Sequence, residues 1–71
     1  MNAKQVSKYV HEGDYVAEVI VTLIVTEEDW APYLSVEDAK KLDTVRLALR
    51  AGDLSRAAEY GRVFKLLPVA A

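Results

Sequence analysis

The chain has no cysteine, a single histidine and only three glycines among its 71 residues. Without cysteine, it has neither disulfides nor thiolate metal sites, and with His11 alone it has no multi-histidine metal site within one chain. Gly13, Gly52 and Gly61 lie far apart, so they form no glycine-rich phosphate-binding loop. Small domains are often stabilised by disulfides, metal sites or oligomerisation. Because the first two are excluded here, oligomerisation is the remaining means to consider.

Long apolar runs and an excess of basic charge are also missing. The longest uncharged run of apolar character, residues 19–25, is far shorter than the ~20 residues that cross a bilayer. Residues 1–10 lack the apolar centre of a signal peptide. The net charge of −2 and the pI near 5.2 argue against general binding to nucleic acid or to anionic membranes. We therefore expect a cytoplasmic protein with no membrane association.

No residue pattern assigns a catalytic chemistry. The serines have no G-x-S-x-G setting, and the acidic triplet at residues 27–29 lacks the glycine-containing spacing of a calcium loop. His11 stands beside Glu12 and Asp14, where a carboxylate can tune an imidazole, but an isolated turn histidine in water is the simpler interpretation. We expect no enzyme activity, no cofactor and no metal.

One stretch, residues 15–26, organises the chain. Most positions from 19 to 26 are β-branched, which favours a strand. Its odd positions form an unbroken apolar face: Tyr15, Ala17, Val19, Val21, Leu23 and Val25. The apolar content of 52% is too high for a disordered chain. We expect a single domain over residues 1–71, with residues 1–5 loose and the odd face against the core.

A hairpin is predicted before this strand. Residues 6–10 alternate and are followed by H-E-G-D. A three-residue loop, residues 11–13, with Gly13 in the left-handed conformation, suits these residues better than a turn with glutamate at positive φ. That register places Tyr9 opposite Tyr15 and Ser7 opposite Ala17, on the apolar face.

Two helices are predicted after the strand. Ser35 is the expected N-cap of the first, with Asp38 completing a capping box. Its expected apolar stripe is Val36, Ala39, Leu42, Val45 and Leu49. Gly52 ends this helix, Asp53 caps a shorter one over about residues 54–60, and Gly61 ends it.

A third strand is predicted over residues 63–67, with Phe64 and Leu66 on one side. Pro68 has no backbone donor, so this strand should be an edge strand or end there. The predicted fold class is α+β: a small ββααβ domain in which an antiparallel sheet carries a helical hairpin on one face.

The opposite face of the long strand is unusually apolar. The predicted partner-binding residues are Val16, Ile20, Ile24, Trp30 and Tyr33. A sheet face left in water should be polar, so something is expected to cover this one. A second copy of the chain is the simplest cover, and another protein is the alternative. Trp30 and Tyr33 fit either a lid on the core or a recognition surface. The acidic residues 27–29 either protect the strand from aggregation or take part in recognition.

Residues 9–69 resemble a group of small uncharacterised bacterial proteins that are similar to the antitoxins of toxin–antitoxin pairs. The segments that carry the resemblance are H-E-G-D-Y-V-A-E-V, W-A-P-Y-L-S-V-E-D-A-x-x-L-D, V-R-x-A-L-R-A-G-D-L and V-F-K-L-L-P-V. The resemblance implies a cytoplasmic protein that binds a protein partner. Together with the apolar strand face, it predicts a non-enzymatic interaction module that forms a homodimer.

The alternative is a DNA-binding regulator, because a strand followed by two helices also looks like a ribbon-helix-helix protein. The outward residues of the strand would then be Glu18, Thr22 and Thr26. None of them is a lysine or arginine that would contact phosphate or guanine. The interaction module is therefore the preferred prediction.

Overall fold

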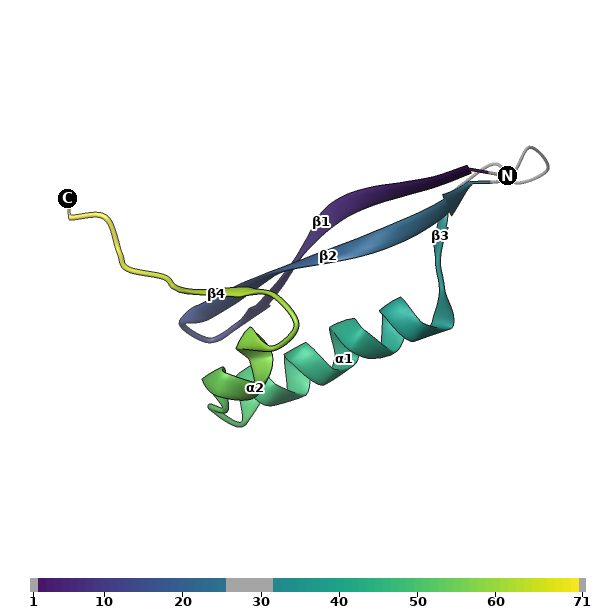
Figure 1. Cartoon of the computed structure of the whole chain (residues 1–71). Helices are drawn as coiled ribbons and strands as arrows, with labels where there is room; N and C mark the ends of the chain where they lie inside the picture. The colour runs from purple at the N-terminus through teal and green to yellow at the C-terminus, as the bar shows by residue number, and fades with distance from the viewer. Residues whose placement is uncertain (1, 26–31, 71) are drawn as a thin grey trace.

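The computed structural model describes residues 2–25 and 32–70, which form one four-stranded antiparallel sheet and two helices. The elements, in chain order, are β1 (Asn2–Glu12), β2 (Tyr15–Val25), β3 (Tyr33–Leu34), α1 (Val36–Arg50), α2 (Leu54–Ala58) and β4 (Arg62–Lys65). Both helices lie on one side of the sheet (Figure 1). The α+β class and the antiparallel sheet are confirmed. The predicted ββααβ order is not confirmed, because a short strand, β3, stands between β2 and α1.

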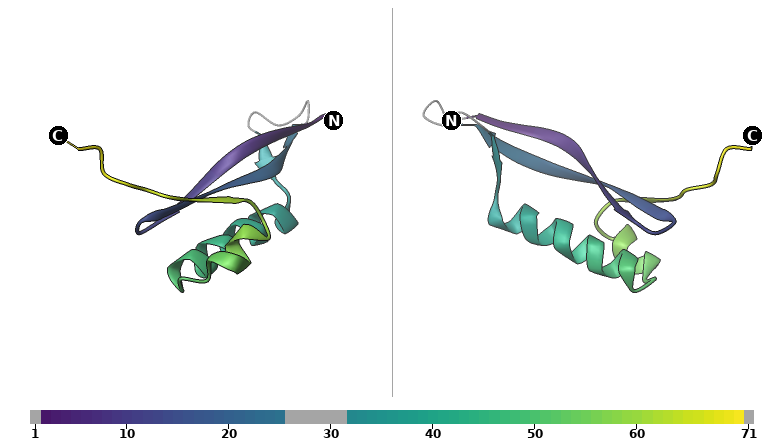
Figure 2. Two further views of the ribbon diagram at one scale, coloured as in Figure 1. Left: turned by 60° about the vertical axis from the view of Figure 1, so that its left-hand side comes forward. Right: turned by 180° about the vertical axis from the view of Figure 1, so that it is seen from behind.

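β2 is the central strand of the sheet. One edge pairs with β1 along its full length, and the other edge pairs with β4 near the hairpin turn and with β3 at the far end. The two views in Figure 2 show the long β1–β2 ribbon above the helical layer, with the chain leading away from the body after β4. β1 begins at Asn2, so residues 2–5, which were expected to be loose, pair with β2.

The hairpin turn differs from the prediction. Glu12 pairs with Tyr15, which leaves Gly13 and Asp14 as a two-residue turn. Gly13 has a φ of 58°, whereas the φ of Asp14 is negative. This combination is typical of a two-residue hairpin turn with glycine at its first central position. The register differs from the predicted one by three residues, so Val10 and not Ser7 lies opposite Ala17 on the helix side. Tyr9, predicted to face the core, is 66% exposed on the other side.

The core lies between the helix side of the sheet and the two helices. Its fully buried members are Val10, Ala17, Val19, Val21, Val45, Ala48, Leu49 and Ala57. The odd face of β2 therefore faces the core, as predicted. The predicted stripe of α1 holds only in its second half, since Val36 is 70% exposed and Ala39 is exposed as well. In the first half of α1 the polar residues Asp38 and Lys41 face the sheet instead, and both hydrogen-bond to the backbone of β2.

Both predicted N-caps are confirmed. The Ser35 hydroxyl accepts a hydrogen bond from the Asp38 N–H at 3.1 Å, and the Asp53 carboxylate accepts one from the Arg56 N–H at 3.2 Å. Gly52 has φ 77° after α1, as the predicted left-handed stop requires. Gly61 is needed for a different reason: a Cβ there would collide with the backbone carbonyl of Glu18 on β2.

Candidate functional site

The sheet face opposite the helices is the candidate site. Val16, Ile20 and Ile24 share this face, because side chains alternate along β2 and its odd residues face the core. Tyr33 pairs with Ile24, so it lies on the same face. In Figure 1 no described helix covers this side of the sheet. We call it the open face.

Four of the five predicted partner-binding residues are therefore brought together. Ile20 is 48% exposed and Tyr33 is 47% exposed, whereas Val16 and Ile24 are half-buried among their neighbours. Trp30 lies outside the described residues. Tyr33 is not a lid on the core, because its side chain is on the open face and not in the core cluster. Its role in recognition stays a prediction.

Two further aromatic side chains widen the apolar part of the open face. Tyr9 pairs with Glu18, and Phe64 pairs with Val16, so both lie on this face; they are 66% and 39% exposed. Tyr9 was missed because the predicted register turned it toward the core. The sequence predicted only that Phe64 shares one side of its strand with Leu66. Which side that is depends on how β4 returns to β2 and pairs Phe64 with Val16.

A polar cluster lies in the middle of the open face. The Glu18 carboxylate accepts hydrogen bonds from the Ser7 hydroxyl at 3.1 Å and the Tyr9 hydroxyl at 3.3 Å. Arg62 lies 4.0 Å from the same carboxylate, and its guanidinium lies over the Phe64 ring at 5.1 Å from the centroid. Arg62 thus partly balances the negative charge of Glu18. The open face therefore presents apolar side chains around a central pair of opposite charges.

Side chains of α1 close a gap in the sheet beside this face. Between β3 and β4, residues 19–22 of β2 have no strand partner on that edge in the part of the chain that the structure describes. The Thr22 N–H donates to Asp38 Oδ2 at 2.7 Å, and Lys41 Nζ donates to the Ile20 carbonyl at 2.9 Å. The predicted capping box is therefore only half formed, because the Asp38 carboxylate binds β2 and not the start of its own helix. This edge is consequently not free for another strand.

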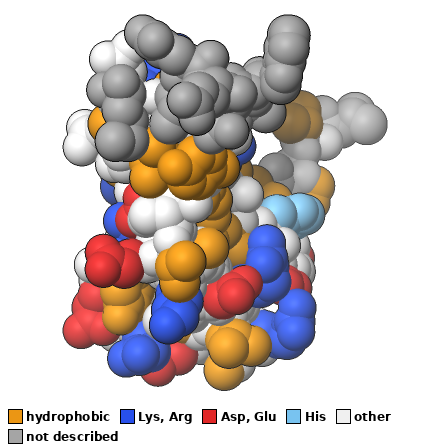
Figure 3. All heavy atoms as spheres, turned by 90° about the vertical axis from the view of Figure 1, so that its right-hand side faces the viewer, with side chains coloured by type: hydrophobic (Ala, Val, Ile, Leu, Met, Phe, Trp, Pro, Cys, Tyr) orange, Lys and Arg blue, Asp and Glu red, His pale blue; other side chains and the backbone are white. Residues whose placement is uncertain are grey.

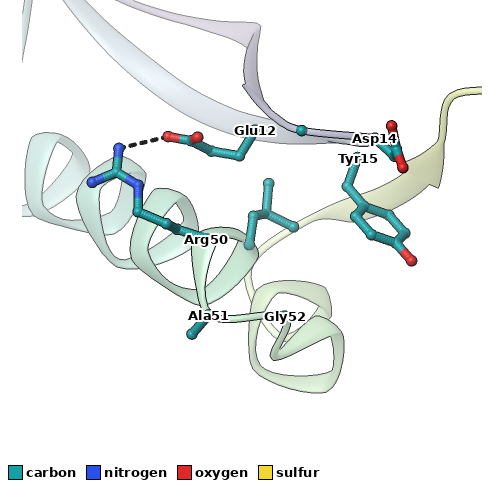
Figure 4. Close-up of a pocket in the computed structure, with 8 residues that line it drawn as sticks. Glu12, Asp14, Tyr15, Arg50, Ala51 and Gly52 are labelled. Carbon is teal, nitrogen blue, oxygen red and sulfur yellow. Dashed lines mark hydrogen bonds and ion pairs between the residues drawn. The ribbon is translucent and has the colours of Figure 1, made fainter.

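A cleft of about 470 Å³ lies between the hairpin turn and the end of α1. In Figure 4 Arg50 points toward Glu12 across the mouth of this cleft, and Arg50 Nη2 donates to Glu12 Oε1 at 2.7 Å. Arg46 Nε also lies 4.0 Å from Glu12. Glu12 and Asp14 are the two carboxylates that line the cleft, and Glu12 is paired with both arginines. In Figure 4 the Asp14 side chain points away from Glu12, so the two do not form a carboxylate pair for acid–base chemistry. His11 is exposed, and its Nε2 lies 2.9 Å from the Gly13 carbonyl.

Within residues 2–25 and 32–70, no three acidic or histidine side chains lie close enough together to hold a metal ion. Among the same residues, no helix has the length and apolar character needed to cross a membrane. Figure 3 shows acidic and basic side chains intermingled over the lower part of the molecule in that view, where a nucleic-acid surface would show a basic stripe.

Comparisons with the models of known protein families, with curated protein sequences and with solved structures find no match to this chain.

Proposed function

We propose that this protein is a small non-enzymatic interaction module of antitoxin-like type, which acts as a homodimer and binds another protein through the open face. One observation carries the proposal: an exposed sheet face on which Ile20, Tyr33 and Phe64 lie in water with no described element over them. An apolar face of this kind is typical of a protein–protein interface.

The composition of the open face favours a protein over a nucleic acid as its partner. Aromatic side chains are enriched at protein interfaces, and Tyr9, Tyr33 and Phe64 are all on this face. Glu18, at its centre, is paired with Arg62, so this pair offers no net positive charge to phosphates. The partner that fits is a folded protein with an apolar patch and a hydrogen-bond donor near Glu18. The resemblance to antitoxins identifies the product of the neighbouring gene as the first candidate.

The test is co-expression with the product of the neighbouring gene, followed by a measurement of affinity with purified proteins. Ile20→Glu places a charge in the middle of the open face, and we expect it to weaken binding at least a hundredfold. Val36→Glu is the matched control, because Val36 is 70% exposed on the outer side of α1. We expect that variant to bind as the unmodified protein does.

Two results would contradict the proposal. Equal loss of binding in Ile20→Glu and Val36→Glu would show that the open face is not the binding surface. Salt-dependent binding of the unmodified protein to DNA, without binding to the neighbouring product, would instead support the ribbon-helix-helix alternative.

A further inference from the structure

The segment that follows β4 is apolar and exposed. Leu66, Leu67 and Val69 are 45%, 74% and 94% exposed, and residues 66–70 carry no charged side chain. Figures 1 and 2 show this segment leading away from the sheet and the helices. Among the described residues, Leu67 and Val69 therefore have little apolar cover from their own copy of the chain.

β4 also has a backbone edge without a strand partner in the described part of the chain. Arg62 and Phe64 pair with β2, and the Leu66 N–H continues this ladder by donating to the Asp14 carbonyl at 2.6 Å. The backbone N–H and C=O groups of the even-numbered residues therefore point toward β2 and the hairpin turn. The backbone groups of Val63 and Lys65 point to the opposite edge, because they alternate along a strand.

An apolar groove lies beside that free edge, on the helix side of the sheet. Its volume is about 530 Å³, and its lining consists of Tyr15, Leu54, Ser55, Ala58, Val63 and Lys65. Four of these residues present apolar or aromatic surface. One copy of the chain therefore carries both an exposed apolar segment and an apolar groove of a size that would receive it.

From these three features we propose that two copies join along this edge, each adding its segment 62–70 antiparallel to the same segment of the other. Leu67 and Val69 of the second copy would then lie beside Lys65 and Val63 on the helix side, in the groove. The inference rests on the proposed function: it specifies how the homodimer forms and leaves the open face to the other protein.

The sequence selects the register of this pairing. A two-fold axis at Leu66 pairs the whole segment 62–70 with itself, whereas an axis at Lys65 would set two like charges directly opposite each other. Pro68 is one of the even-numbered residues, whose backbone groups point toward the hairpin and away from the second copy. Its missing N–H therefore removes no hydrogen bond from the new ladder.

The other long free edge suits self-pairing less well. β1 has no strand partner on its outer edge in the described residues, but Lys4 and Lys8 pair with Leu23 and Val19 on the helix side. Charged side chains that point inward on an edge strand prevent edge-to-edge association. β4 has one such lysine, and the register at Leu66 sets it opposite Leu67.

A disulfide tests the register directly, because the chain has no cysteine of its own. An axis at Leu66 brings the two Leu66 Cα atoms to about 4.5 Å, as in a non-hydrogen-bonded antiparallel pair. That separation allows a disulfide. We expect Leu66→Cys to form a covalent dimer on mild oxidation, while Ile20→Cys, whose side chain is on the open face, remains largely monomeric on a non-reducing gel. The reverse pattern would overturn the inference.

Sedimentation of the full chain provides the second test. We expect a concentration-dependent dimer whose dissociation constant rises at least tenfold in Leu67→Pro, since proline removes an N–H from the new ladder. Pro68→Ala is the control and should dimerise as before. Circular dichroism should show the same fold in all three proteins, because Leu67 lies outside the strands and helices. A monomer at high micromolar concentration, or a dimer unaffected by Leu67→Pro, would refute this mode of association.

The two proposals fail separately. If Ile20→Glu abolishes partner binding but keeps the dimer, and Leu67→Pro weakens the dimer, both hold. If Ile20→Glu dissolves the dimer and Leu67→Pro does not, the open face is the dimer interface and the edge pairing is wrong. If the dimer depends on Leu67 but Ile20→Glu does not affect partner binding, the edge pairing holds and the proposed function of the open face is wrong.

Discussion

Removing the Asp38 carboxylate should loosen the contact between α1 and the centre of β2. Asp38 Oδ2 accepts the Thr22 N–H at 2.7 Å, and Thr22 lies in the gap between β3 and β4, where no described strand supplies an acceptor. Asp38→Ala leaves that N–H without its partner. An unsatisfied buried donor costs about 1–3 kcal/mol, and because this bond is only part-buried we expect about 1–2 kcal/mol.

For a domain of this size, that loss would lower the melting temperature by about 4–8 °C per kcal/mol. Thermal unfolding followed by circular dichroism measures it, and amide hydrogen exchange localises it to Thr22. Asp38→Asn keeps an oxygen acceptor and should lose less than half as much. Asp43→Ala is the control, because its side chain is 74% exposed. If Asp38→Ala and Asp43→Ala melt together and the Thr22 amide exchanges at its original rate, the bond does not hold α1 to the sheet.

Three other substitutions test the fold. Val45→Ala should lower the free energy of unfolding by about 2–3 kcal/mol, because Val45 is fully buried. Leu47 is 61% exposed on the same helix, so Leu47→Ala should lower it by under about 0.5 kcal/mol. Equal losses in urea unfolding would mean that the buried face of α1 is assigned wrongly. Gly61→Ala should destabilise the fold more than Gly52→Ser does, because its Cβ would meet the β2 backbone; a neutral Gly61→Ala would disprove that close approach. Ser35→Ala should cost about 1 kcal/mol, and an unchanged melting curve would show that Ser35 is not the cap.

The parts of the fold that depend on local sequence were predictable. The alternation of β2 identified its core face, and Ser35, Gly52 and Asp53 marked the helix ends, because caps and positive φ angles have short-range residue preferences. The same alternation gathered Val16, Ile20 and Ile24 on one face. These features required no knowledge of which segments meet.

The errors arise where distant segments meet. A Gly13-Asp14 turn and a three-residue loop over residues 11–13 both satisfy the local residues, but they differ by three positions in register. Because that number is odd, the side chain of Tyr9 moved to the open face. The apolar stripe of α1 was extrapolated to Val36, yet Asp38 and Lys41 face the sheet because β2 has unpaired backbone groups there. A pattern of apolar residues does not indicate where the backbone of a neighbouring strand needs hydrogen-bond partners from side chains. For the same reason, Phe64 joins the open face only through the pairing of β4 with β2.

The central claim is that the open face binds a protein, and chemical-shift mapping tests it most directly. Adding the product of the neighbouring gene to the isotopically labelled chain should shift the amide signals of Ile20, Tyr33 and Phe64. The signals of Val36 and Leu47, exposed on the outer side of α1, should stay in place. Shifts confined to α1, with the open face unchanged at saturation, would contradict the claim.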